Sequence, residues 1–447
     1  VAARVSFAAA VAVAPQAPVA PHALSWQARM AHAAGESATA LELYRRIVAQ
    51  YPASELVDQA WTDQAIVHKK MGALDQAIAA LARVGRQSPL WAKSQAEAGD
   101  MLLAAGRLDQ LNAEFDISGA LAAAEETGDD ETAAELHYIL GRIARERGDR
   151  PGVVAQMGAV IAKSRGPQLL AFAHFFRGLA RYQLGGLADS AGDSLRGRAH
   201  FEAAVADLDL LLSSEPTAQL RAVAYRTRGV ALTRLERSVE AVQTYQLLIA
   251  AAPDAAERSE FELMLMELYY DQGQRAQTEV VARSLAAGAE VETDIAERAH
   301  FVLVSLLLEG ERYAEALATA TEALGRFPDS ADRATLESVR ARSLFFLERY
   351  AEAARAFAGF VTAYPGHAEL PSALFQQGYC HEFLGQYERA ATAFGAVADR
   401  FGQDALAGDA LYRRAENLYN ASKFSQALAA YLRVVDEHGG TALAAKA

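Results

Sequence analysis

Apolar residues recur along the chain with helical spacing, and short breaks that carry Gly or Pro separate one helical segment from the next. No stretch alternates apolar and polar residues with the period of two that a half-buried strand shows. The first pair of segments covers 24–34 and 38–50, with a break at Gly35 and an end at Pro52. This pattern predicts an all-α chain built from paired helices.

Three blocks near the C-terminus repeat the same chemistry at a fixed spacing. Each block has an aromatic residue, an Ala three residues later and a second aromatic four residues after that. The blocks are Tyr350, Ala353 and Phe357; Tyr387, Ala390 and Phe394; and Phe424, Ala427 and Tyr431. Successive alanines are 37 residues apart, and so are Pro52 and Pro89. The 447-residue chain exceeds the ~250–300 residues at which a single core stops growing. A stacked array has no such limit, so we predict about eleven helix-turn-helix repeats.

The fifth unit departs from the period. Its first helix is expected to end at Gly185-Gly186, whereas counting back from Pro216 places the small residue of its second helix at Ala204. The segment 186–199 between them is polar and rich in Gly, which predicts an inserted surface loop. Such a loop can lie on the binding face of a repeat array, although a tolerated insertion without function is the simpler interpretation.

The predicted organisation therefore has four parts. These are a leader at 1–23, N-terminal repeats at 24–185, an inserted loop at 186–199 and C-terminal repeats at 200–447, with the array truncated at its end. In the leader, Arg4 precedes the apolar stretch 5–14, and Ala12-Val13-Ala14 provides a cleavage site of the A-x-A kind. This layout predicts a signal peptide and a location in the bacterial periplasm or cell envelope. The alternative is a disordered leader rich in Ala and Pro, with the protein in the cytoplasm.

Charge and composition narrow the classes of partner. The net charge is −13 and residues of both signs are mixed along the helices, whereas a nucleic-acid binder needs a basic face. The longest apolar run in the body of the chain, 301–308, is far shorter than the ~20 residues that span a bilayer. We therefore expect neither nucleic-acid binding nor direct membrane insertion. The sequence does not predict an oligomeric state.

The chain lacks the motifs that would indicate catalysis. It has no phosphate-binding Gly-rich loop, no H-E-x-x-H zinc motif and no nucleophile elbow. The single cysteine, Cys380, excludes an internal disulfide and is expected to be a small buried hydrophobe. The acidic residues within 125–131 are best explained as a solvated loop before a helix. We predict a protein that is not an enzyme and has no cofactor or metal.

The repeats resemble the tetratricopeptide repeat family. Its units have a small residue within the first helix, a Gly at the turn, an Ala and an aromatic in the second helix, and a closing Pro. These are matched by Gly35, Ala40, Tyr44 and Pro52, by Gly229, Ala241, Tyr245 and Pro253, and by Gly378, Gly385, Ala390 and Phe394. The resemblance covers about 24–440 and implies a right-handed α-solenoid. The unit length of 37, where 34 is usual, and the ending at 357–365 are similar to repeat proteins of the bacterial envelope. Examples are the barrel-assembly lipoprotein and the cell-division coordinator of the Tol–Pal system.

In this family the first helix of each unit lines a concave groove that binds partners. The corresponding residues of the last three units are Arg342, Phe345, Phe346, Phe375, Tyr379, Glu382, Phe383, Tyr412, Glu416 and Tyr419. Aromatic side chains with a few charges are typical of protein-binding hot spots. The Lys and Asn of the carboxylate-clamp subclass are not matched, because Arg226 is followed by Val230 and Tyr412 by Glu416.

The sequence thus predicts a non-catalytic scaffold that binds a protein or peptide segment in this groove, within a bacterial envelope complex. The alternative is a cytoplasmic regulatory or sensor module that binds a peptide or an effector domain. A third interpretation makes the chain the recognition arm of an enzyme whose catalytic domain lies elsewhere.

Overall fold

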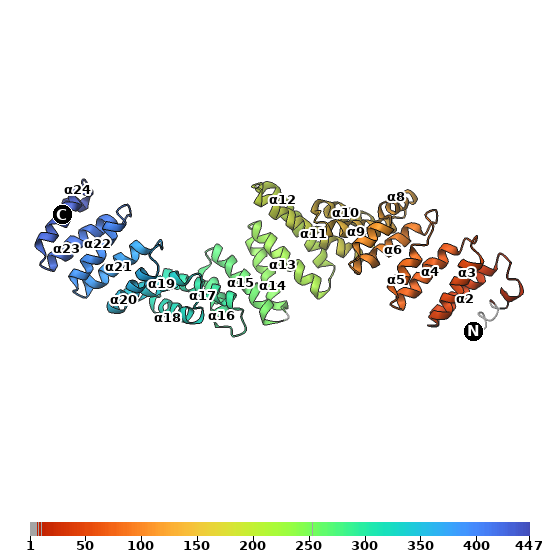
Figure 1. The fold of residues 1–447 in the computed structure, drawn as a ribbon, viewed down its shortest axis with the longest axis horizontal. Helices are drawn as coiled ribbons and strands as arrows, with labels where there is room; N and C mark the ends of the chain where they lie inside the picture. The colour runs from red at the N-terminus through yellow and green to blue at the C-terminus, as the bar shows by residue number, and fades with distance from the viewer. Residues whose placement is uncertain (1–6, 8, 10, 253) are drawn as a thin grey trace. The chain divides into compact units, whose positions relative to one another are not determined.

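The computed structural model describes residues 7, 9, 11–252 and 254–447, and in these residues all regular structure is helical. The chain forms two compact units, Val1–Thr244 and Tyr245–Ala447 (Figure 1). Within each unit the helices pack mainly on their neighbours in sequence, as successive pairs. This is the α-solenoid of helical repeats that the 37-residue spacing predicts.

The helices of the unit Val1–Thr244 are α2 (Ala20–Ala33), α3 (Ser37–Gln50), α4 (Val57–Lys70), α5 (Leu74–Leu81), α6 (Trp91–Ala104), α7 (Leu108–Glu114), α8 (Ile117–Thr127), α9 (Asp130–Glu146), α10 (Arg150–Lys163), α11 (Pro167–Ser190), α12 (Ser194–Ser213) and α13 (Ala218–Arg234). The boundary between the units falls within α14 (Ser238–Ala251). The helices of the unit Tyr245–Ala447 are α15 (Ala255–Asp271), α16 (Arg275–Ala287), α17 (Thr293–Glu309), α18 (Tyr313–Arg326), α19 (Arg333–Phe346), α20 (Tyr350–Ala363), α21 (Leu370–Phe383), α22 (Tyr387–Arg400), α23 (Ala407–Asn420), α24 (Phe424–Glu437) and α25 (Ala442–Lys446).

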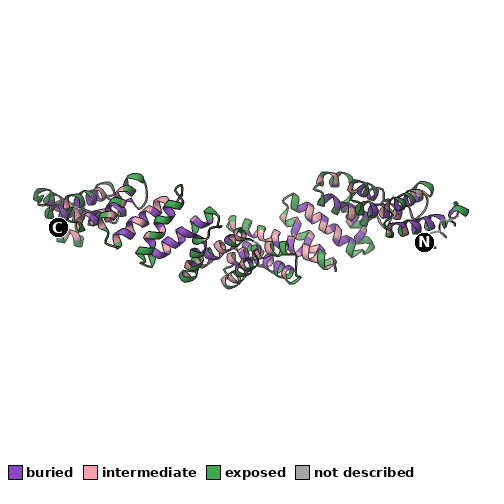
Figure 2. Ribbon diagram, turned by 90° about the horizontal axis from the view of Figure 1, so that it is seen from below, coloured by how far each residue is buried: buried purple, intermediate pink, exposed green. Residues whose placement is uncertain are grey.

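Small residues allow the two helices of a pair to cross closely. A Cβ added to Gly378 on α21 would lie 2.7–2.8 Å from ring carbons of Phe394 on α22, and one added to Gly185 on α11 would lie 2.6–2.9 Å from those of Phe201 on α12. Phe394 is fully buried and Phe201 nearly so. Figure 2 shows buried positions along the sides where neighbouring helices meet, and exposed positions on the outer sides and at the turns. The core of each unit is thus a row of small interhelix clusters rather than one central cluster.

The turn inside a pair contains a residue with positive φ, and before α9, α10 and α12 an Asp side chain then caps the helix that follows. Gly148 has a φ of 73°, and the carboxylate of Asp149 accepts a hydrogen bond from the backbone N–H of Gly152 at 2.9 Å. This is the N-cap arrangement that satisfies one of the free N–H groups of a helix start. Where the chain lacks Gly at this position, Glu236, Glu311, Glu348 or Ser422 adopts the positive φ instead.

The predicted loop at 186–199 is wrong. Residues 186–190 continue α11, residues 194–199 begin α12, and only 191–193 form a turn. The extra residues lengthen both helices, to 24 and 20 residues. Gly192 has a φ of 81° and the side chain of Asp193 caps α12, so this turn has the same chemistry as Gly148-Asp149. Gly185, which was expected to end the first helix, instead allows close helix packing, because it faces the ring of Phe201.

The predicted leader at 1–23 lies partly outside the described residues, at 1–6, 8 and 10. Val11 is buried in the cluster formed by α2 and α3, with Phe7 packed against it. The hydroxyl of Tyr51 donates a hydrogen bond to the carbonyl oxygen of Pro15 at 2.6 Å. Helix α2 then begins at Ala20. The described residues before α2 therefore contact the first helix pair.

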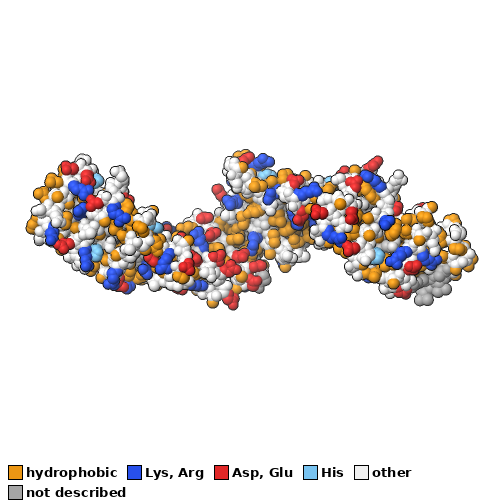
Figure 3. Space-filling view, in the orientation of Figure 1, with side chains coloured by type: hydrophobic (Ala, Val, Ile, Leu, Met, Phe, Trp, Pro, Cys, Tyr) orange, Lys and Arg blue, Asp and Glu red, His pale blue; other side chains and the backbone are white. Residues whose placement is uncertain are grey.

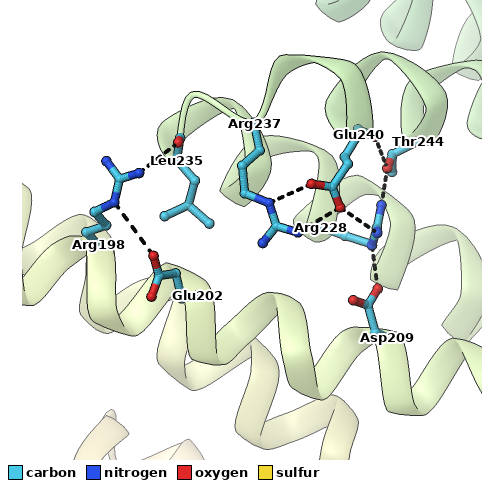
Figure 4. Close-up of polar contacts among 8 residues, drawn as sticks. All are labelled: Arg198, Glu202, Asp209, Arg228, Leu235, Arg237, Glu240 and Thr244. Atoms are coloured by element: carbon cyan, nitrogen blue, oxygen red, sulfur yellow. Dashed lines mark hydrogen bonds and ion pairs between the residues drawn. The ribbon is translucent and has the colours of Figure 1, made fainter.

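Arginine side chains connect consecutive helices at the surface. On α13, Arg228 forms an ion pair with Asp209 of α12 at 2.6 Å and donates a hydrogen bond to the hydroxyl of Thr244 on α14 (Figure 4). Arg237, in the turn before α14, binds Glu240 at 2.7 Å.

Acidic and basic side chains are interspersed on the face of each unit seen in Figure 3. None of the helices in the described part of the chain is both long and apolar enough to cross a bilayer.

Candidate functional site

Aromatic side chains form a connected row in the unit Tyr245–Ala447. The rings of Tyr313 and Phe346 stack with centroids 4.5 Å apart, and Phe346 contacts Phe345 at 5.4 Å. Phe345 in turn contacts Phe383 at 6.3 Å, and Phe383 stacks on Tyr350 at 4.6 Å. The row therefore links α18, α19, α20 and α21, with α19 and α21 being the first helices of successive pairs.

The two rings that are open to solvent are Phe346 and Phe383, whose side chains are 43% and 57% exposed. Phe375 and Tyr379, also predicted to line the groove, lie deeper. Both contact the buried ring of Phe394, at 5.3 and 5.4 Å, so they contribute to packing between α21 and α22. The predicted residues thus divide into an accessible part and a part that supports the helix pair.

A polar cluster continues the row from α21 to α23. The guanidinium of Arg413 lies 5.2 Å from the centroid of the Tyr379 ring, and 3.4 Å separates its Nη1 from carboxylate oxygens of Glu382 and Glu416. Asn417, fully buried, donates a hydrogen bond from Nδ2 to Glu382 at 2.6 Å. These contacts fix the position of Glu382 and Glu416 between the helices.

The remaining predicted residues lie beside these contacts. Tyr412 packs against Tyr431 of α24 at 5.9 Å, and the exposed Tyr419 contacts Phe424 at 5.4 Å. Arg342 is half-buried on α19. All ten predicted residues are exposed or half-buried, and the contacts above connect seven of them across α19, α21 and α23: Phe345, Phe346, Phe375, Tyr379, Glu382, Phe383 and Glu416.

Sequence reasoning missed Tyr313, Tyr350, Arg413 and Asn417. The two tyrosines are at the repeated aromatic position that begins the second helix of a unit, and each stacks on a ring 33 residues later. The recurrence of this spacing in the sequence could have predicted both tyrosines as partners of the exposed rings. Arg413 and Asn417 each follow a predicted residue of α23 directly, so a broader choice of helix face would have included them.

Cys380 is buried on α21, in the core cluster against which Phe345 and Tyr350 pack. Burial raises the pKa of its thiol to about 12. At pH 8 the reactive thiolate is therefore rare, and we expect native protein to react with a disulfide reagent about 1,000-fold more slowly than protein unfolded in urea. Rapid stoichiometric labelling of the native protein would contradict this.

Among the described residues no group of three or more His, Cys, Asp or Glu side chains is placed to hold a metal ion.

Comparisons with protein families and solved structures found similarity to tetratricopeptide repeat proteins. Models of the tetratricopeptide repeat match residues 372–404 and 409–441, and a second such model matches 2–55. No curated protein matches the chain. Among solved structures, the C-terminal part of a TPR repeat-containing protein from Cytophaga hutchinsonii is 14% identical, with a TM-score of 0.45, and the match covers 61% of this chain and 99% of that one. A tetratricopeptide repeat protein from Parabacteroides merdae is 15% identical, with a TM-score of 0.32 and coverage of 63% and 98%.

The matched residues overlap the helix pairs α2–α3, α21–α22 and α23–α24, and a residue with positive φ recurs at the turns inside the pairs between them. The chain contains tetratricopeptide repeats.

Proposed function

We propose that the protein is a non-catalytic scaffold for protein–protein interaction, and that a partner segment binds along α19, α21 and α23. The observation that supports this most is the pair of accessible rings, Phe346 and Phe383, each stacked on a tyrosine of a neighbouring helix. Repeats of this family are protein-binding modules, and large apolar side chains open to solvent are a typical feature of binding surfaces.

The stacking favours binding for an entropic reason. A ring already held between neighbours loses little rotamer freedom when a partner covers it, so more of the contact free energy remains for affinity. The ion pairs of Arg413 with Glu382 and Glu416 add fixed acceptors that can receive hydrogen bonds from the backbone of a partner. An extended or helical segment fits this combination.

The location remains the one that residues 1–23 favour, a bacterial envelope complex, with the cytoplasmic regulatory module as the alternative. The mature N-terminus, read by mass spectrometry on protein purified from native cells, distinguishes them. A processed N-terminus supports the envelope, and an unprocessed one supports the cytoplasm.

The binding surface is tested by replacing both accessible rings, as Phe346→Ser with Phe383→Ser. Quantitative capture from envelope and cytoplasmic fractions should recover at least about tenfold less of the partner than wild type does, because truncation of hot-spot aromatics commonly costs 2 kcal/mol or more. The matched control is Leu428→Ser with Leu432→Ser on α24, whose side chains are 61% and 53% exposed. It removes a similar apolar area outside the row and should leave capture unchanged.

Two results would argue against the proposal. One is full partner recovery by the ring variant with helical circular dichroism intact. The other is an equal loss in ring and control variants, which would indicate non-specific apolar adhesion.

A further inference from the structure

The unit Val1–Thr244 contains a cavity of about 620 Å³ that was not predicted from the sequence, whereas the aromatic row belongs to the unit Tyr245–Ala447. Its walls come from the first helices of consecutive pairs, α4, α6, α9 and α11. The lining includes one cationic residue, Lys69 on α4, together with Glu97 and Asp100 on α6, Glu135, Tyr138 and Ile139 on α9, and Phe172 on α11.

Carboxylates dominate the polar part of this cavity. The carboxylate of Asp100 forms an ion pair with the guanidinium of Arg142 at 3.5 Å. Glu131, at the rim, accepts hydrogen bonds from the hydroxyl of Ser164 and the backbone N–H of Arg165. Within the described residues, however, neither Glu97 nor Glu135 forms an ion pair. The cavity thus contains two described carboxylates that form no ion pair of their own.

The position of Glu135 carries an electrostatic cost. Burial raises the pKa of this carboxyl, Lys93 partly opposes the shift, and the neighbouring charges of Glu97 and Glu131 raise the pKa further. Both causes disfavour the charged form and would be relieved by a cation placed between the carboxylates. Side chains that destabilise a fold in this way are common at binding sites.

Beside the carboxylates, the rest of the lining is mainly apolar and aromatic. Tyr138 and Phe172 lie with ring centroids 6.1 Å apart, and Ile139 and Leu169 complete the surface. The guanidinium of Arg142 already lies 5.7 Å from the centre of the Tyr138 ring, which shows that this aromatic surface accommodates a cation. A long aliphatic stem that ends in a positive charge would match this lining, with the stem against the rings and the charge against the carboxylates.

We propose that this cavity binds the side chain of an arginine or lysine from a partner segment, with its cationic group between Glu97 and Glu135. The site lies in a different unit from the accessible rings Phe346 and Phe383, so the proposal does not depend on them. It gives the unit Val1–Thr244 a preference for basic segments that the overall charge of the chain alone would not specify.

The test uses the full chain and three fluorescent pentapeptides in which alanine alternates with arginine, lysine or citrulline. Citrulline has the shape of arginine without its charge. Fluorescence anisotropy should show binding of the arginine and lysine peptides and at least tenfold weaker binding of the citrulline peptide. Glu97→Gln with Glu135→Gln should weaken binding of the basic peptides at least tenfold.

The matched control is Glu42→Gln with Asp109→Asn, which removes the same charge from exposed positions of α3 and α7. It should bind like wild type. The thermal stability of the Glu97/Glu135 variant should equal or exceed that of wild type, because the substitutions remove like-charge repulsion. The proposal is overturned if basic peptides do not bind at millimolar concentration, if citrulline binds equally well, or if both double variants lose affinity to the same extent.

Discussion

Replacing Asp207 by alanine is expected to destabilise the unit Val1–Thr244 by about 3–5 kcal/mol, the range for breaking a buried ion pair from one side. The carboxylate of Asp207 on α12 is 2% exposed. It binds Arg177 at 2.6 Å, Arg181 at 2.7 Å and the Nδ1 of His174 at 3.0 Å, all on α11. Without it, two guanidinium groups that are 17% and 24% exposed would lose their counter-charge.

Urea unfolding followed by circular dichroism measures this loss, and hydrogen exchange localises it to α11 and α12. The matched control is two residues away on the same helix. Asp209 is 49% exposed and pairs with Arg228 (Figure 4), so Asp209→Ala should cost only about 0–1 kcal/mol, as surface ion pairs do. Equal losses in the two variants would show that burial of Asp207 has no energetic consequence.

A third variant separates the ion pair from the space that it fills. Asp207→Leu combined with Arg177→Met and Arg181→Met replaces the buried charges by apolar groups. It should be clearly more stable than Asp207→Ala, because no charge is left buried without a partner. If it is no more stable, the loss in Asp207→Ala comes from altered packing instead.

The helix pairs were predictable because the signals that define them are local and recur. An aromatic, an Ala and a turn residue at fixed spacing give the length and the packed face of each helix before any contact is known. The fifth unit was predicted wrongly because the polar, Gly-rich composition of 186–199 indicated a loop, although Gly192 and Asp193 mark a short turn between two helices. The Gly192-Asp193 turn repeats that of Gly148-Asp149, but 44 residues further along, where the 37-residue period predicts none.

The candidate sites were predictable only in part. Phe346 and Phe383 lie 37 residues apart, as do their stacking partners Tyr313 and Tyr350, so the repeat alone accounts for the two equivalent stacks. The bond between Asn417 and Glu382 joins residues 35 apart through side-chain reach, which no motif encodes. The acidic cavity of the other unit draws its walls from four helices between 69 and 172, and no single stretch of sequence contains its pattern.

The second large effect is expected at the crossing of α21 and α22. Phe394 is fully buried, and its ring fills the space that Gly378 leaves open. Phe394→Ala should destabilise the unit Tyr245–Ala447 by about 3–5 kcal/mol, because it removes a buried ring and leaves a cavity. Chemical denaturation with exchange measurements on α21 and α22 records the loss.

Gly378→Ala tests whether the glycine is needed for the Phe394 ring, because its effect on stability should have opposite signs with and without that ring. In the wild-type background the added methyl would lie 2.7 Å from a buried ring carbon, so we expect a loss of about 1–3 kcal/mol despite the better helix propensity of alanine. In the Phe394→Ala background the ring is gone, and the same change should stabilise by up to about 1 kcal/mol.

Gly141→Ala on α9 provides the contrast. Its added methyl would meet the terminal carbon of Met157, which can rotate away, so the effect should stay within about 1 kcal/mol in either direction. If Gly378→Ala were equally mild, the glycine would not be needed for the ring. If instead its effect reverses with the residue at position 394, small residue and ring form one unit of packing, and this pairing sets how closely the two helices of a repeat approach.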